Sequence, residues 1–119
     1  MLMTLEEIKK ILDAEVVSSS ADLRTEVRMG CGCDLMSDVL AFIKADSVLL
    51  SGLTNPQVVR TAEMADVKAI CFVRGKRPSQ ETVLLAEGKS IPLLCTQLPM
   101  FEACGRLYKN GLPGCSEVE

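Results

Sequence analysis

The feature that most constrains this chain is a repeated alternation of short apolar runs with amphipathic segments. Strand-like runs lie at 47–52, 67–73 and 91–96, and each is followed by a polar loop and a segment with helical periodicity. Such alternation is typical of crossover units, in which helices join parallel strands. We therefore predict an α/β domain with three layers, helix–sheet–helix, around a mostly parallel sheet.

Most of the predicted helices are preceded by a residue that can cap them. The helices are expected over residues 4–14, 35–44, 56–66, 80–89 and 99–111. The residues expected to cap the first four are Thr4, Asp34, Asn55 and Ser79. Glu7 stands three residues after Thr4, which is the spacing of a capping box, and Pro56 fits the first position of its helix.

The remaining segments complete a single domain. Two more strands are expected over 15–18 and 25–30, and "CGC" is expected to turn the chain after the second of them. A length of 119 residues is that of one ordinary domain. We expect this domain to span 1–112 and to be followed by a frayed tail over 113–119.

Charge and hydropathy exclude several classes of partner. The net charge is −3, and the longest basic cluster is "RGKR" at 74–77. Binding to nucleic acid normally requires a basic face that replaces the phosphate counterions, so neither nucleic acid nor a membrane surface is an expected partner. We expect no signal peptide, and the sequence has no apolar run long enough to span a membrane. We expect a cytoplasmic protein.

Four loops follow the predicted parallel strands, so they should meet at the carboxyl ends of those strands. Ligands of open parallel sheets bind at this end. These loops lie at 30–33, 51–55, 74–77 and 96–99. Each precedes the amino-terminal end of a helix, where free N–H groups favour an anion. The candidate ligand-binding residues are Gly32, Ser51, Gly52, Thr54, Asn55, Arg74 and Gly75. The alternative is that the glycines only permit tight turns and that the basic residues, which include Lys76 and Arg77, are solvated.

The residue inventory argues against an enzyme. The chain has no histidine, so Ser–His and Cys–His nucleophiles and histidine-based zinc sites are absent. The segment "VRGKRP" lacks the upstream glycine and the following Ser or Thr of a phosphate loop. The segment "GCGCDL" lacks the spacing of a dinucleotide fingerprint. We predict no catalytic residues.

The six cysteines divide into two groups. Those expected to be buried as small apolar side chains are Cys71, Cys95 and Cys104. Cys31 and Cys33 could hold a metal or an iron–sulfur cluster, with Cys115 or a dimer partner supplying further ligands. They could also be reactive thiols, because a helix start lowers the pKa of a nearby thiol. The third interpretation is a plain glycine-rich turn, and no cofactor is then expected.

The segments "LEEIKKILDAEVVS", "MGCGCDLMSDVLAF", "LLSGLTNPQVVRTAEMADVKAICFVRGKRP" and "IPLLCTQLPMFEACGRLYKNGL" together resemble the stand-alone DRTGG-domain proteins found near iron-only hydrogenase genes. The counterpart of the D-R-T-G-G stretch is 51–55, where Gly52 and Thr54 keep the small and hydroxyl character. The resemblance implies a fold like the N-terminal domain of HPr kinase/phosphatase, and a regulatory, dimerising module rather than a catalyst.

Three functions follow as hypotheses. The first is a regulatory module that dimerises and senses a small anionic ligand, such as a nucleotide or a phosphorylated metabolite. The second is an iron–sulfur or redox accessory protein of a hydrogenase complex, acting through Cys31 and Cys33. The third is a scaffold that only dimerises and docks, to a hydrogenase or another metabolic enzyme, with Met36, Met64 or Met100 at its interface.

Overall fold

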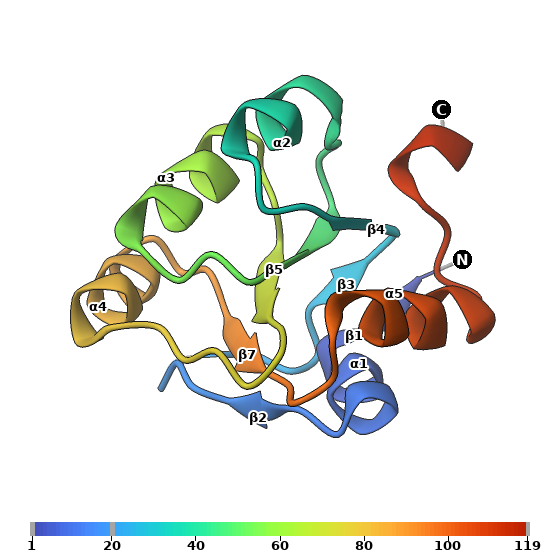
Figure 1. Ribbon diagram of the computed structural model, residues 1–119, viewed down its shortest axis with the longest axis horizontal. Helices are drawn as coiled ribbons and strands as arrows, with labels where there is room; N and C mark the ends of the chain where they lie inside the picture. The colour runs from blue at the N-terminus through green and yellow to red at the C-terminus, as the bar shows by residue number, and fades with distance from the viewer. Residues whose placement is uncertain (1, 20, 119) are drawn as a thin grey trace.

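The computed structural model describes residues 2–19 and 21–118 (Figure 1). Its helices are α1 (Leu5–Leu12), α2 (Met36–Phe42), α3 (Pro56–Met64), α4 (Gln80–Gly88), α5 (Met100–Lys109) and the short 3-10 helix η1 (Cys115–Glu117). Its strands are β1 (Met3–Thr4), β2 (Glu15–Val16), β3 (Glu26–Val27), β4 (Met29–Gly32), β5 (Ser47–Ser51), β6 (Ala69–Phe72) and β7 (Leu93–Cys95). Each predicted helix is therefore present, and its ends lie within two residues of the predicted ones.

The central sheet has five strands in the order β2-β7-β6-β5-β4. Strands β4, β5, β6 and β7 run parallel to one another, whereas β2 pairs antiparallel with β7. Strands β1 and β3 form a separate antiparallel pair. The predicted mostly parallel sheet is confirmed.

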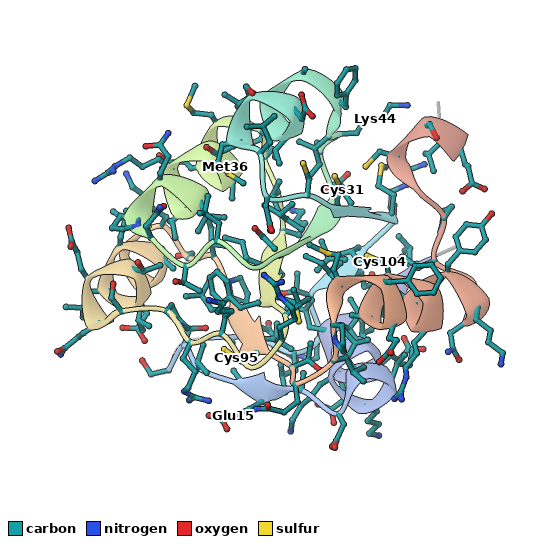
Figure 2. The ribbon with its side chains drawn as sticks, viewed as in Figure 1. Glu15, Cys31, Met36, Lys44, Cys95 and Cys104 are labelled. Atoms are coloured by element: carbon teal, nitrogen blue, oxygen red, sulfur yellow. The ribbon has the colours of Figure 1, made fainter. Side chains whose placement is uncertain are left out.

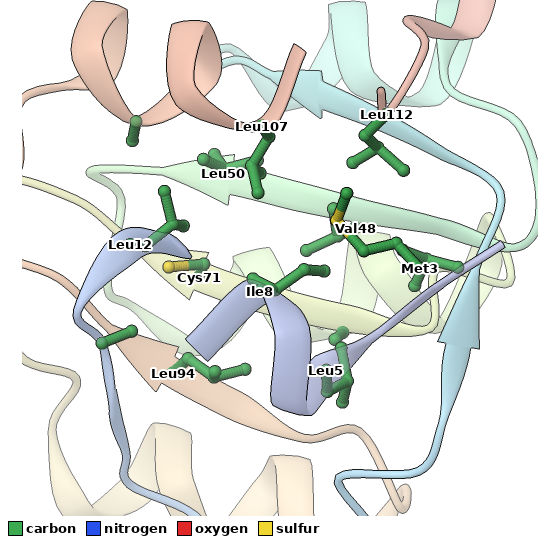
Figure 3. Close-up of a cluster of buried hydrophobic side chains, with 14 of the residues drawn as sticks. Met3, Leu5, Ile8, Leu12, Val48, Leu50, Cys71, Leu94, Leu107 and Leu112 are labelled. Carbon is green, nitrogen blue, oxygen red and sulfur yellow. The ribbon is translucent and has the colours of Figure 1, made fainter. Parts of the chain in front are cut away.

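Helices cover both faces of this sheet (Figure 1). Alternate residues of a strand point to opposite faces, so Val48 and Leu50 of β5 pack with α1 and α5, whereas Leu49 packs with α2, α3 and α4. Figure 3 shows the first of these clusters, in which Ile8 of α1 lies among side chains of the sheet. The three-layer prediction is therefore confirmed.

Local capping signals predict three of the helix starts correctly. The Thr4 hydroxyl accepts the N–H of Glu7, and the Glu7 carboxylate accepts the N–H of Thr4, which completes the capping box. The side chains of Asn55 and Ser79 also cap α3 and α4. Each accepts a backbone N–H of the first helical turn, without the reciprocal bond of a capping box. These interactions join residues within one helical turn, so a short stretch of sequence contains all that they require.

The prediction of a turn at "CGC" is wrong. Cys31 and Gly32 belong to β4, where they pair with Leu49 and Leu50 of β5. The strand predicted over 25–30 is instead divided between β3 and β4. Glycine locally favours turns, but the ladder with β5 satisfies the backbone of β4 and overrides that preference.

The segment after Leu112, where the sequence predicts a frayed tail, makes defined contacts. Gly114 forms a parallel bridge with Gly30, whose N–H donates to the carbonyl of Pro113 at 2.9 Å. The Tyr108 hydroxyl donates to Glu117 of η1. Residue 119 of the predicted tail, residue 1 of the predicted domain and residue 20 of the connector lie outside the described residues. No helix in the described ranges has both the length and the apolar character that crossing a membrane requires.

Candidate ligand-binding site

Four loops lie together at one end of the sheet; three follow the strands as predicted, whereas the loop predicted at 30–33 begins only after Gly32, because 30–32 belong to β4. They follow β4, β5, β6 and β7, which are parallel, so their carboxyl ends share one edge. We call this edge the carboxyl-end rim and define it by the loops 33–35, 52–55, 73–79 and 96–99. Each of these loops leads into the amino-terminal end of α2, α3, α4 or α5.

Asp34 joins two of these loops. Its Oδ1 accepts the N–H of Gly52 at 2.6 Å and the hydroxyl of Ser51 at 2.9 Å. The buried Ser51 hydroxyl in turn accepts the N–H of Leu53 at 3.1 Å. The prediction that Asp34 caps the following helix is therefore wrong, since α2 starts after Leu35 without a side-chain cap. A hydroxyl and an amide from the neighbouring loop are better partners for this carboxylate than the amides of its own short helix.

Arg74 brings a positive charge to the same place. A Cβ atom on Gly52 would lie 3.0 Å from Arg74 Nη2 and 3.5 Å from Asp34 Oδ2, so both side chains border the space above Gly52. Arg74 adopts a left-handed backbone conformation, with φ of 57°, and its N–H donates to the carbonyl of Leu98. Four other non-glycine residues outside the rim share this conformation, so it describes the turn at Arg74 and does not by itself indicate a site.

The other two basic residues of this loop differ in their surroundings. The Arg77 guanidinium donates to the Glu15 carboxylate at 2.7 Å, on the outer strand β2. This contact lowers the pKa of the Glu15 carboxyl group. Lys76 is exposed, and within the described part of the chain it forms no ion pair. Arg74 is thus the basic side chain that borders the rim beside Gly52.

Gly75, Thr54 and Asn55 hold the loops in place. The N–H of Gly75 donates to the carbonyl of Thr96, and its φ of 69° favours glycine. The Asn55 side chain caps α3, and the Thr54 carbonyl accepts the hydroxyl of Thr82. That these residues also contact a ligand stays a prediction.

Gly32 lies apart from the other predicted residues. A Cβ atom on it would lie 2.6 Å from Cys104 Sγ and 3.0 Å from Met100 Sδ, so this side of Gly32 faces α5. The structure therefore brings Ser51, Gly52 and Arg74 together. Gly32 lies instead against α5, away from these three residues.

Sequence reasoning missed two residues of the rim. Asp34 follows the end of a strand, where polar residues gather in parallel sheets, but its position before a helix favoured the capping interpretation. Gln97 is the second, because its Oε1 lies 2.6 Å from the point where a Cβ on Gly75 would stand. Only the pairing of β6 with β7 brings Gln97 to that point.

Cys31 lies on β4, and Cys33 is the first residue after this strand. Cys33 Sγ donates to the carbonyl of Leu35 at 3.4 Å. Burial, with smaller effects from Cys115, Cys33 and Cys104, raises the pKa of Cys31 to about 11. Figure 2 shows Cys31 and Cys104 near each other and far from Cys95. The expectation of a lowered thiol pKa is therefore wrong for Cys31, because burial disfavours the thiolate.

The metal hypothesis gains no support from the side-chain arrangement. In the ranges 2–19 and 21–118, no three His, Cys, Asp or Glu side chains are grouped so that they could hold a metal ion. Cys71 and Cys95 are buried, as expected, whereas Cys104 is only partly buried.

Cys31 should react slowly with alkylating reagents at neutral pH, because little of it is thiolate. We expect the alkylation rate at Cys31 to rise about ten-fold per pH unit between pH 8 and pH 10. Peptide mass spectrometry after timed iodoacetamide treatment measures this rate. The control is the protein unfolded in urea, where Cys31 should react like any free cysteine. A rate that already levels off below pH 9 would contradict the raised pKa.

An apolar groove of about 320 Å³ runs between β4 and α5. Its lining includes Gly30, Gly32, Cys104, Gly105, Tyr108 and Leu112. Two aromatic residues of this lining are largely exposed, Phe101 at 87% and Tyr108 at 60%. We call this surface the β4–α5 groove; it lies along the edge strand of the sheet, not among the four loops of the rim.

Comparison with known proteins identifies similar chains. The sequence profile of the DRTGG domain family matches residues 7–109. No curated protein matches the chain in sequence. The fold is similar to the crystal structure of the CBS and DRTGG domains of the regulatory region of Clostridium perfringens pyrophosphatase, complexed with its activator diadenosine tetraphosphate. The two chains are 19% identical with a TM-score of 0.70, and the match covers 98% of this chain and 50% of the other. This chain therefore spans half the length of that regulatory region.

Proposed function

Because the chain belongs to the DRTGG domain family, we propose that it is a non-catalytic regulatory module that binds a small anionic ligand at the carboxyl-end rim. The ligand class is a nucleotide or a phosphorylated metabolite. The observation that carries this proposal is the gathering of Ser51, Gly52 and Arg74 where the loops after β5 and β6 meet. The similar regulatory region of the pyrophosphatase binds diadenosine tetraphosphate, which supports the same ligand class.

The chemistry of the rim suits binding rather than catalysis. A guanidinium can donate two parallel hydrogen bonds to a phosphate, and the amino-terminal ends of α3 and α4 add the positive ends of two helix dipoles. The chain has no histidine to transfer protons near neutral pH. We therefore propose that this chain does not transform the ligand, and that it reports ligand binding to a partner such as a metabolic enzyme.

Replacing Arg74 with alanine should weaken ligand binding at least about ten-fold, because charge-assisted hydrogen bonds to the anion are lost. The measurement is the shift of the melting temperature with ATP, diadenosine tetraphosphate and inorganic phosphate, since a ligand that binds only the folded state stabilises it. Arg106→Ala is the matched control, because it removes the same charge from an exposed position on α5. If none of the three probes stabilises the wild-type protein at millimolar concentration, the proposed function fails.

We also propose that the protein is a homodimer, with the β4–α5 groove as its interface. β4 is an edge strand, and among the described residues its outer side is paired only through the Gly30–Gly114 bridge. Exposed aromatic rings beside an apolar groove are typical of an interface between protein chains.

Of the methionines predicted at an interface, Met64 is 70% exposed but lies on α3, whereas Met36 and Met100 are partly buried. No observation on the described residues favours the redox role in a hydrogenase complex.

A further inference from the structure

We propose that Asp34 is a built-in competitor for the ligand, and that an anion reaches the Gly52 amide only when it displaces the Asp34 carboxylate. This inference rests on the proposed function, since it concerns the regulation of the same site. The carboxylate accepts the amide N–H of Gly52 that a phosphate oxygen would have to accept.

Hydrogen bonds already occupy the amide of Gly52 and the hydroxyl of Ser51. The Gly52 N–H can donate one strong hydrogen bond, and Asp34 Oδ1 accepts it at 2.6 Å. The Ser51 hydroxyl proton is also directed to Oδ1, and the Leu53 N–H is directed to the Ser51 oxygen. An incoming anion therefore finds both donors occupied by an acceptor of its own charge.

The positive charge of Arg74 can neutralise the incoming anion when this anion displaces the Asp34 carboxylate. The guanidinium lies beside the same space, but no ion pair joins it to Asp34 within 4.0 Å. It can therefore turn to an incoming phosphate without first breaking a close salt bridge. The Asp34 carboxylate can move into water, because Asp34 is exposed.

The same movement would connect the rim to the edge of the sheet. Asp34 lies in the loop between β4 and α2, and α2 has no side-chain cap. When the ligand takes the Gly52 amide, this loop loses the contacts of Asp34 to the loop after β5. Ligand binding would therefore release the loop that follows the edge strand β4, while the Cys33 N–H keeps its bond to the Leu50 carbonyl.

The test is isothermal titration with inorganic phosphate, ATP and diadenosine tetraphosphate in the presence of EDTA. Asp34→Asn keeps an oxygen that can accept both hydrogen bonds, so the fold should be retained, which circular dichroism and the melting temperature check. We expect Asp34→Asn to bind at least about five-fold more tightly than the wild type, because a like charge about 4 Å from the anion is removed. Asp38→Asn, on the exposed side of α2, makes the same charge change and should alter the affinity less than two-fold.

Each outcome bears on one of the two proposals. If the wild type binds and Asp34→Asn binds equally well or more weakly, the competitor role is overturned while the proposed function stands. If neither protein binds any probe, the proposed function fails and the competitor role falls with it. A second titration with Mg²⁺ in place of EDTA detects a cation that bridges Asp34 to the phosphates. Tighter binding by the wild type than by Asp34→Asn under that condition would also overturn the competitor role.

Discussion

Replacing Gly32 with alanine is expected to lower the free energy of unfolding by about 1–3 kcal/mol, the usual cost of inserting a methyl group where neighbouring atoms are too close. The new Cβ would lie 2.6 Å from Cys104 Sγ and 3.0 Å from Met100 Sδ. The Cys104 sulfur can move away only by rotation about χ1, which is restricted on a helix, whereas Met100 has more freedom. Unfolding in urea, followed by circular dichroism, measures the difference from the wild type.

Two variants separate this clash from a general effect of replacing glycine. Gly88→Ala on α4, away from the β4–α5 groove, has nothing within 4 Å of its new Cβ, and alanine favours a helix, so it should stabilise the protein by up to about 1 kcal/mol. Combining Gly32→Ala with Cys104→Ala should recover most of the lost stability, because the sulfur is removed. If Gly32→Ala alone leaves the stability unchanged, β4 and α5 do not approach each other as described.

Replacing Phe101 with serine is expected to weaken the proposed homodimer at least about thirty-fold, which corresponds to about 2 kcal/mol for one central aromatic residue of an interface. The Phe101 ring is 87% exposed in the single chain, so its loss should not disturb the core. Analytical ultracentrifugation over a range of concentrations measures the dissociation constant.

The matched control for this variant is Leu84→Ser. Leu84 is 58% exposed on α4, which covers the opposite face of the sheet from α5, so the dimer should be unaffected. A wild-type protein that remains monomeric at high micromolar concentration would contradict the dimer proposal. The ligand-binding proposal would remain, because the rim consists of loops of one chain.

Much of the fold could be predicted because its signals are local. The capping box of Thr4 with Glu7 and the cap of Asn55 join residues two or three positions apart. The strands β5, β6 and β7 are buried along their whole length, and each could be predicted from a short run of consecutive, mostly apolar residues. Parallel strands with single crossovers then bring their carboxyl ends to one edge, so the common location of the four loops also followed from the sequence.

The contents of the site depended on contacts between distant residues. Asp34 accepts the N–H of Gly52, 18 positions away, and this long-range bond prevails over the helix cap that the neighbouring residues predict. The Cys31 thiol has its pKa raised by burial, although its place before a helix predicted the reverse.

The sequence by itself determined the five helices and the strands β5, β6 and β7 between them, the caps at Thr4, Asn55 and Ser79, and the end of the sheet at which the loops gather. The tertiary structure alone decided that "CGC" continues a strand, that residues 113–118 contact the edge of the sheet, and that a carboxylate occupies the amide of Gly52. Periodicity and caps are properties of a few consecutive residues. Hydrogen-bond partners and burial belong to whichever segments the packed sheet brings together.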